Sequence, residues 1–195
     1  QKFVVSNFTG TSFAYTTKPV SDYYDYGLKK VEVLSASNVL KYTIGNGKES
    51  VSQALNTTQK SGKTLMLYKA QELLDAGFSA GEIQGFSLHA LQGGTANFFK
   101  IQIKQSSQNQ LDPNAAETNG YTEVYRNTLE FAKGDQQIVF HTPFTWDGKS
   151  HLLVEFSFTN TSGSSAVVFE GSADTANCMM WANNNFAVDL ASNGQ

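Results

Sequence analysis

Apolar and polar residues alternate along most of the chain. In the segment 99–104, Phe99, Ile101 and Ile103 alternate with lysine and glutamine, and the segment 151–158 repeats this period of two. A period of two places every second side chain on one face of a strand, so both segments predict half-buried strands. Further strands are expected at residues 2–6, 30–34, 39–44, 64–68, 82–91, 121–131, 136–140, 166–170, 179–182 and 186–190. Many short strands separated by turns predict an all-β fold, an antiparallel β-sandwich.

One segment carries a helical pattern instead. Ala70, Leu73 and Leu74 have the spacing of one helix face, and Gly77 stands where helices commonly end in the left-handed conformation. We therefore expect one short helix near residues 69–76, lying across one end or edge of the sandwich.

Two segments read as loops. Residues 45–63 and 106–120 are rich in Asn, Gly, Ser and Thr and poor in bulky apolar groups. We expect a single sandwich domain over residues 1–195, with a surface loop or an internal linker at 45–63. An alternative is that residues 178–195 begin a further unit.

Composition narrows the class of protein. Aromatic residues make up 12% and charged residues 16% of the chain, which provides material for a core under a weakly charged surface. The net charge is −3 and Arg126 is the single arginine, so a nucleic-acid-binding function is excluded. Cys178 has no second cysteine with which to form an internal disulfide. The apolar runs are too short for a membrane helix, so we expect no membrane span.

Residues 65–158 carry motifs that point to a known kind of domain. These are Tyr-x-Ala-x-Glu-Leu-x-x-Ala-Gly at 68–77, Ala-Gly-x-Ile at 80–83, Asn97-Phe98 with Ile101, Gly-Tyr-Thr-x-Val-Tyr at 120–125, and Thr-Pro-Phe-Thr-Trp-Asp-Gly at 142–148 before Leu-Leu-Val-Glu at 152–155. This part of the chain resembles an accessory β-sandwich domain of secreted, multidomain surface proteins of Bacteroidota. The resemblance implies a jelly-roll-like fold, a secreted or cell-surface location and an accessory role, and it supplies no catalytic residues. A start at Gln1 instead of Met fits a mature exported chain.

Two candidate catalytic patterns lack their usual context. The segment 77–81 matches Gly-x-Ser-x-Gly, but a helix precedes Ser79 and a strand follows it, the reverse of a nucleophile elbow. The histidines His89, His141 and His151 lie on different expected strands without metal-ligand spacing, so we expect three independent histidines. A third pattern, Glu123 with Glu155, remains open as a glycosidase pair if their strands are neighbours.

A calcium site is the candidate for a metal. The segment 112–123 has the length of an EF-hand loop, with oxygen ligands at Asp112, Asn114 and Glu123. A true EF-hand is excluded because Glu117 occupies the position that requires glycine. A less regular structural calcium site that also uses Asn119 remains an alternative, and we expect no other cofactor.

Two aromatic clusters are the candidate ligand contacts. Trp146 precedes an Asp147-Gly turn, so its ring either fills the end of the core, the favoured reading, or stands exposed as a stacking platform. The tyrosines Tyr23, Tyr24 and Tyr26 either pack against the fold, again the favoured reading, or present rings and hydroxyls to a sugar.

Together these features predict a non-catalytic extracellular module for binding, adhesion or carbohydrate contact within a larger surface protein. The expected partners are a polysaccharide or a host or biofilm surface polymer, and neighbouring domains of the same chain. Two alternatives stay open: the N-terminal part of a secreted glycan- or peptide-directed hydrolase, and a structural spacer.

Overall fold

The chain divides into two compact units. In the computed structural model of the protein, the described residues are 2–9, 12–18, 40–45, 47–172 and 178–184. The first unit spans residues 1–41, and within it β1 (Lys2–Thr9) pairs antiparallel with β2 (Ser12–Lys18). The second unit spans residues 42–195. The strand expected at 30–34 lies outside the described residues.

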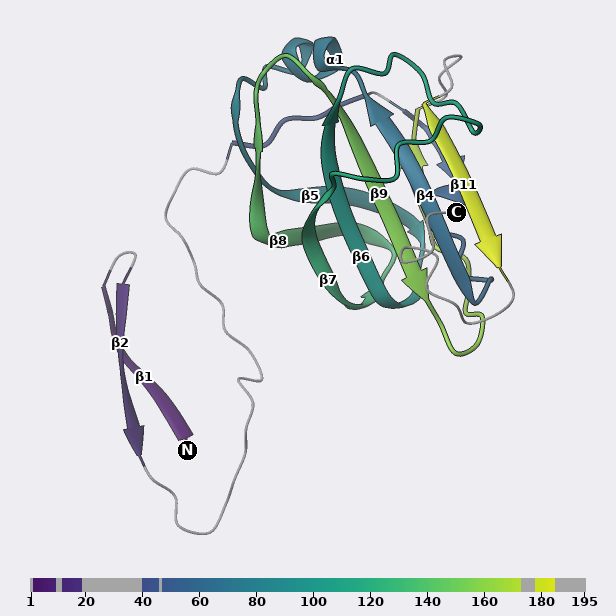
Figure 1. The fold of residues 1–195 in the computed structure, drawn as a ribbon. Helices are drawn as coiled ribbons and strands as arrows, with labels where there is room; N and C mark the ends of the chain where they lie inside the picture. The colour runs from purple at the N-terminus through teal and green to yellow at the C-terminus, as the bar shows by residue number, and fades with distance from the viewer. Residues whose placement is uncertain (1, 10–11, 19–39, 46, 173–177, 185–195) are drawn as a thin grey trace. The chain divides into compact units, whose positions relative to one another are not determined.

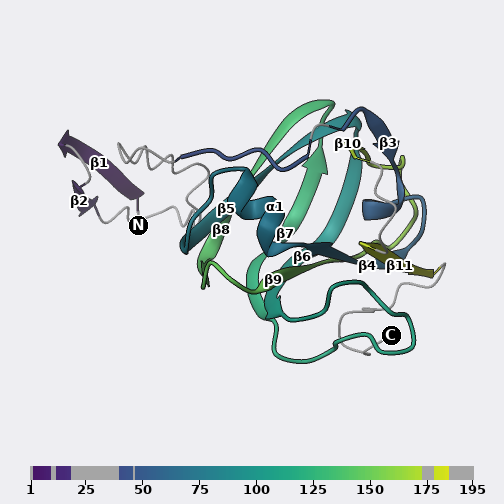
Figure 2. The same cartoon turned by 90° about the horizontal axis from the view of Figure 1, so that it is seen from above.

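The second unit is a sandwich of two antiparallel sheets (Figures 1 and 2). A four-stranded sheet has the order β3-β10-β5-β8, and a five-stranded sheet has the order β11-β4-β9-β6-β7. The strands are β3 (Glu49–Val51), β4 (Ser61–Tyr68), β5 (Gly81–Gln92), β6 (Gly94–Ser106), β7 (Thr122–Phe131), β8 (Gly134–Trp146), β9 (His151–Thr159), β10 (Val168–Gly171) and β11 (Met179–Asn184). The predicted all-β antiparallel sandwich is therefore confirmed.

The connections follow a jelly roll. From β3 to β10 the chain changes sheet at every step except between β6 and β7, which pair with each other. The resulting orders, β3-β10-β5-β8 and β4-β9-β6-β7, are those of two Greek keys folded into two four-stranded layers. Strand β11 then adds a fifth strand beside β4.

The inner faces of the two sheets form one core. Phe99, Ile101 and Ile103 on β6 have no exposed surface, as their alternation predicts. The ring of Phe99 makes edge contacts with Phe131 at 5.7 Å and Phe156 at 5.3 Å between centroids. Aromatic edge contacts of this kind stabilise a core beyond the area that they bury.

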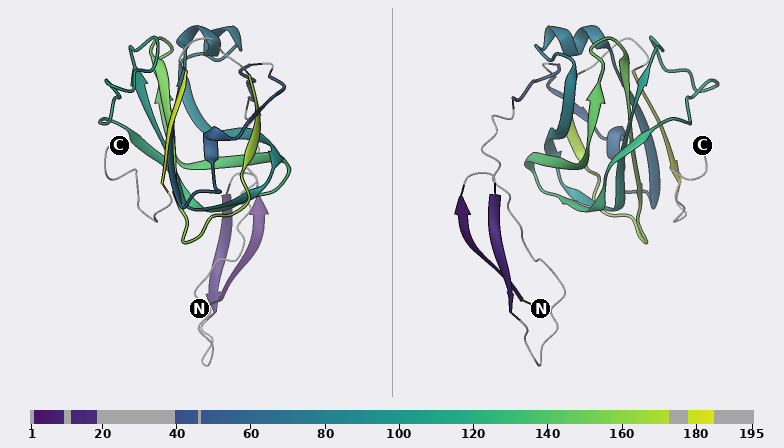
Figure 3. Two further views of the ribbon diagram at one scale, coloured as in Figure 1. Left: turned by 90° about the vertical axis from the view of Figure 1, so that its right-hand side faces the viewer. Right: turned by 60° about the vertical axis from the view of Figure 1, so that its left-hand side comes forward.

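The predicted helix is present as α1 (Ala70–Asp75), at one end of the sandwich (Figures 1 and 3). It begins with a capping interaction in which the Lys69 amide donates to the Glu72 carboxylate at 2.8 Å. It ends at Gly77, whose φ of +91° is the left-handed conformation that glycine adopts readily. The Phe78 amide then donates to the Leu73 carbonyl, which completes the cap.

The segment 45–63 is part of the sandwich, and its interpretation as a loop or linker is wrong. It contains β3, the 3-10 helix η1 (Gln53–Leu55) and the start of β4. Leu55 is 1% exposed, and the buried Thr57 hydroxyl donates to the Ser165 carbonyl and accepts from the Val167 amide. The strand expected at 39–44 is absent from residues 40–44, which have no regular structure.

The end of the chain also differs from the expectation of a further unit. Residues 179–184 form β11, in which Met179 pairs with Met66 and Asn184 with Ser61. These residues therefore extend the five-stranded sheet, while the strand expected at 186–190 lies outside the described part of the chain. In that described part, neither helix has the length and apolar character needed to cross a membrane.

Candidate functional site

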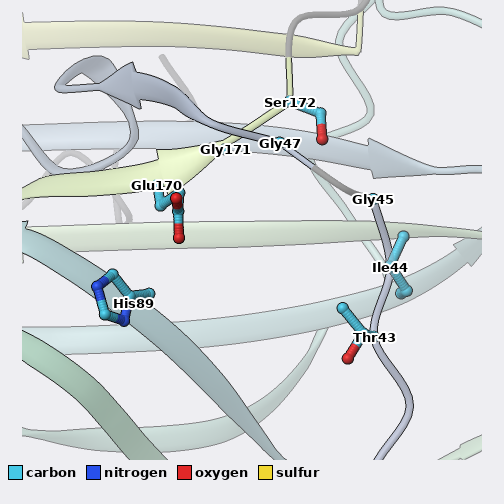
Figure 4. Close-up of a pocket in the computed structure, with 8 residues that line it drawn as sticks. All are labelled: Thr43, Ile44, Gly45, Gly47, His89, Glu170, Gly171 and Ser172. Carbon is cyan, nitrogen blue, oxygen red and sulfur yellow. The ribbon is translucent and has the colours of Figure 1, made fainter.

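A pocket of about 230 Å³ opens on the outer face of the four-stranded sheet. Its residues come from the segment before β3, from β5 and from the end of β10 (Figure 4). The lining consists of Thr43, Ile44, Gly45, Gly47, His89, Glu170, Gly171 and Ser172.

Strand register places a carboxylate on either side of an imidazole in this pocket. Phe169 on β10 pairs with Ala90 on β5, and both side chains are buried, so the adjacent Glu170 and His89 face outward. On the other side, His89 pairs with Asp135 on β8, and its Nδ1 lies 2.7 Å from Asp135 Oδ1. The result is an outward row Glu170–His89–Asp135 across three neighbouring strands.

Glycines expose backbone to the pocket. A Cβ at Gly47 would lie 1.8 Å from the Gly171 carbonyl oxygen, so no larger residue fits there without moving the backbone. Gly45 has φ +79°, and a Cβ on it would lie 2.7 Å from Ser172 Oγ. The segment before β3 can lie directly against the end of β10 because the glycines at this contact have no side chains.

The pocket has a mixed polar chemistry. It offers the hydroxyls of Thr43 and Ser172, the carboxylate of Glu170 and the imidazole of His89, beside the 39% exposed side chain of Ile44. No lysine or arginine lines it, so nothing in it favours an anionic ligand. Donors and acceptors beside an aliphatic side chain suit a small hydroxyl-rich group.

Trp146 belongs to the core. It is 1% exposed, its Nε1 donates to the Ser150 carbonyl at 2.7 Å, and its ring stacks on Phe78 at 5.3 Å. The favoured reading, a ring that fills the end of the core, matches this position. The assignment of Trp146 as a ligand contact is therefore wrong, because the ring is not presented to solvent.

Asp147 caps the turn that follows. Its Oδ1 accepts from the Ser150 and Lys149 amides at 2.8 Å each, and its Oδ2 accepts from the Ser150 hydroxyl. These hydrogen bonds, with the Ser150 amide first, hold the pKa of Asp147 below its usual value. The carboxylate therefore already accepts hydrogen bonds from the residues of its own turn. The other assigned contacts, Tyr23, Tyr24 and Tyr26, lie outside the described residues.

Two of the residues proposed to hold calcium, Glu123 and Asp112, already accept hydrogen bonds within the protein. Both Glu123 oxygens accept from the Arg126 guanidinium, at 2.9 and 2.6 Å, and this interaction lowers the pKa of Glu123. Asp112 Oδ1 accepts from the Asn114 amide at 2.8 Å, which makes a local turn. Within the described ranges, no group of three or more His, Cys, Asp and Glu side chains is placed to hold a metal ion.

The loop between β6 and β7 is arranged around the ammonium group of Lys104. Lys104 on β6 donates to the Asn119 carbonyl at 2.8 Å, forms an ion pair with Glu117 and lies 5.8 Å from the centre of the Tyr121 ring. The loop lies over the outer face of the five-stranded sheet (Figures 1 and 2), and its Leu111 is 2% exposed against that sheet. Lys104 supplies the positive charge that a calcium ion would bring.

The candidate catalytic residues are not assembled into a reactive group. Ser79 lies in the connection from α1 to β5, as its sequence context predicts. His151 Nδ1 accepts from the Ala70 amide at 2.9 Å, so its Nε2 carries the proton directed to Asn109. The ring of His141 stacks on Tyr125.

The two carboxylates considered as a glycosidase pair are not on neighbouring strands. Glu155 on β9 and Glu123 on β7 both pair with Gln102 on the intervening β6. Each carboxylate has a cation beside it, since Lys63 Nζ lies 3.3 Å from Glu155 and Arg126 binds Glu123. The hydrogen bonds from Arg126 favour the ionised form of Glu123, which disfavours it as a general acid.

Most of the pocket was not predicted from the sequence. His89 was considered only as a metal ligand, and Thr43, Glu170 and Ser172 were not considered. The one local signal is glycine, at Gly45 and Gly47 and again at Gly171, because close backbone approach requires residues without a side chain.

No protein-family model, no curated protein and no solved structure matches the chain. The fold and the site therefore define the class of protein by themselves: a jelly-roll β-sandwich with an open, polar pocket on one sheet face.

Proposed function

We propose that the sandwich unit is a non-catalytic carbohydrate-binding module of a secreted or cell-surface protein. The observation that carries the proposal is the pocket at His89 and Glu170, which combines hydroxyl, carboxylate and imidazole groups with exposed backbone. Sugars present many hydroxyl groups that both donate and accept hydrogen bonds, and this lining offers partners of both kinds. The motifs of residues 65–158 support the secreted or surface location.

The state of the carboxylates supports binding over hydrolysis. A glycosidase needs one carboxylic acid that stays protonated near neutral pH and a second, ionised carboxylate at a set distance. Glu155 and Glu123 are each paired with a cation, and the pKa of Glu123 is lowered.

The test is an NMR titration of the whole chain with a panel of neutral hexasaccharides built from glucose, mannose, xylose or N-acetylglucosamine. We expect at least one to shift the amide signals of His89, Glu170 and Ser172. The variant Glu170→Gln keeps the size of the side chain but removes its charge, and it is expected to weaken binding about tenfold, because a charge-assisted hydrogen bond is lost.

A matched control is Glu82→Gln, which removes an exposed carboxylate from β5 outside the pocket. It is expected to bind like the unmodified protein. Equal weakening by both variants would show a general charge effect instead of a site. A panel that shifts none of the pocket amides would leave the role of a structural spacer in place of binding.

A further inference from the structure

Phe98 is exposed in a strained conformation. Its φ is +49°, a region that bulky residues rarely adopt, and among the described residues other than glycine it is the one with positive φ. Its neighbours on the strand, Ala96 and Phe99, are fully buried, while Phe98 is 65% exposed. An aromatic side chain therefore stands in water on a backbone that disfavours it.

The cause of this conformation is a bulge in β6. Ala96 pairs with Leu129 and Phe99 with Asn127, so that Asn97 and Phe98 together face the single residue between those partners. Bulges of this kind redirect a side chain and are common beside functional sites. Here the bulge turns the Phe98 ring to the outer face of the five-stranded sheet, away from the core.

A buried amide holds the bulge in place. Asn160, which is 1% exposed, accepts from the Asn97 amide at 2.7 Å and donates to the Thr95 carbonyl at 2.9 Å. The Ser164 hydroxyl makes further hydrogen bonds to Thr95. Strain persists only where the surroundings over-determine it, and this network is what fixes Phe98 outward.

The surroundings of the ring indicate the chemistry of its partner. The β7 residue opposite the bulge, Thr128, is polar and exposed, and Asn97 beside Phe98 on the bulge carries an amide. Among the described residues, the other large exposed apolar side chains are Leu40, Tyr42, Ile44, Leu74, Val139 and Trp181, and none of them belongs to β6, to β7 or to β9. A protein interface needs a broad apolar patch, whereas one ring among amides and hydroxyls suits a ligand with an apolar face and a polar edge.

We propose that Phe98 is a stacking platform for a sugar ring, which lies on the phenyl face while its hydroxyls meet the adjacent amide and hydroxyl side chains. This site shares its ligand class with the proposed function but none of its residues, since the pocket lies on the other sheet. The module would then hold glycan through both outer faces of the sandwich, as a cross-linking element would.

The test uses Phe98→Asn, because asparagine tolerates positive φ while removing the ring. We expect its melting temperature to equal or exceed that of the unmodified protein, and its binding to the same neutral hexasaccharides at this face to weaken about tenfold. Phe98→Tyr keeps the ring and is expected to bind like the unmodified protein. Binding at this face is read from the amide signals of Asn97, Phe98 and Phe99.

A matched control is Val139→Asn, since Val139 is also 65% exposed but lies on β8. It is expected to leave the amide shifts at the bulge unchanged. Shifts confined to His89 and Glu170 would refute the stacking platform and keep the pocket, whereas shifts confined to the bulge would do the reverse. Unchanged binding by Phe98→Asn, or no shift at the bulge with any hexasaccharide, would overturn the proposal.

Discussion

The two outer faces of the sandwich use charged side chains in different ways. On the four-stranded sheet, the pair His89–Asp135 is open to solvent, with side chains 45% and 82% exposed. On the five-stranded sheet, Lys63 and Glu155 form a pair whose side chains are only 14% and 7% exposed. The polar pair on the four-stranded sheet is thus available to a ligand, whereas the ion pair on the five-stranded sheet is sequestered.

The difference follows from what lies over each sheet. The loop after β6 crosses the five-stranded sheet (Figure 2). Its Leu111 packs against Leu65, Leu67 and Leu153. Burial removes water from charged groups, so the polar side chains beneath must be paired inside the protein. The four-stranded sheet keeps its row of polar side chains in water, where partners can exchange. We therefore expect substitutions to change mainly stability on the covered face and mainly binding on the open face.

The largest effect is expected from breaking the covered pair. Lys63→Met keeps the length of the side chain but leaves Glu155 without this cation, and it should lower the free energy of unfolding by about 3 kcal/mol. Urea unfolding followed by tryptophan fluorescence measures this, since Trp146 and Trp181 both lie in the sandwich unit. Lys133→Met removes an exposed lysine and serves as the control. Equal stability of the Lys63 and Lys133 variants would contradict the distinction between the faces.

The second largest effect is a loss of stability at alkaline pH, which is expected from the ionisation of Tyr68. Burial, with smaller contributions from the charges of Cys178 and Glu72, raises the pKa of Tyr68 to about 12 from 10.0. A raised folded-state pKa means that the stabilisation is complete below pH 10 and is lost as the pH rises to about 12. The loss should amount to about 2–3 kcal/mol.

Tyr68→Phe removes the ionisable hydroxyl and should flatten stability across this alkaline range. Within the described part of the chain, the hydroxyl donates one weak hydrogen bond, to Met66 Sδ at 3.9 Å, so the substitution removes little else. Unfolding curves recorded across the range compare the two proteins. An identical alkaline decline in both would assign the effect to other groups.

Local pattern predicted the strands that line the core well, for a physical reason. Segments such as 99–104 and 151–158 place every second, apolar residue in the core, as the sequence pattern predicts. The burial itself does not alternate in β9, because Leu153, Glu155 and Ser157 on its outer face are also buried. The prediction of a loop at 45–63 is wrong because some of its buried residues, including Thr57 and Ser61, are small and polar. Such residues are common in loops, so the composition of the segment hides its burial. The partner of Thr57 is Ser165, 108 residues away, and no local window contains it.

The same limit applies to the sites. His89 and Glu170 become neighbours only through the register of β5 with β10, which no local spacing specifies. The exposure of Phe98 depends on a bulge that Asn160 holds from the end of β9. By contrast, the turn at Asp147-Gly148 was predictable, because that signal is contained within a few residues.

The third effect tests the loop that covers the five-stranded sheet. Lys104→Met removes the ammonium that joins Asn119 and Glu117, and it should cost about 1–2 kcal/mol. Burial raises the pKa of Glu117, but hydrogen bonds from Lys104 and Ser106 outweigh it and lower the pKa below 4.5. A lowered pKa stabilises the fold above pH 4.5 and loses this contribution as the pH falls further.

The stability difference between Lys104→Met and the unmodified protein should therefore shrink in acid, as measured by urea unfolding at several pH values. Lys149→Met, on the turn after β8, provides a control with an exposed lysine. If added calcium restores the stability of Lys104→Met, the loop can also use a metal ion; no such rescue is expected, because Asp112 and Glu123 keep their other partners.

The smallest effect on stability is expected on the open face. His89→Ala removes the pair with Asp135, but exposed pairs contribute little because water and salt screen them, so the free energy of unfolding should fall by less than about 1 kcal/mol. If the pocket binds sugar, the same substitution should weaken that binding about tenfold, since the imidazole is one of its few side-chain donors. Urea unfolding and the hexasaccharide titration measure the two quantities on the same sample. A large loss of stability would mean that the row Glu170–His89–Asp135 supports the fold, and the contrast between the two faces would then be wrong.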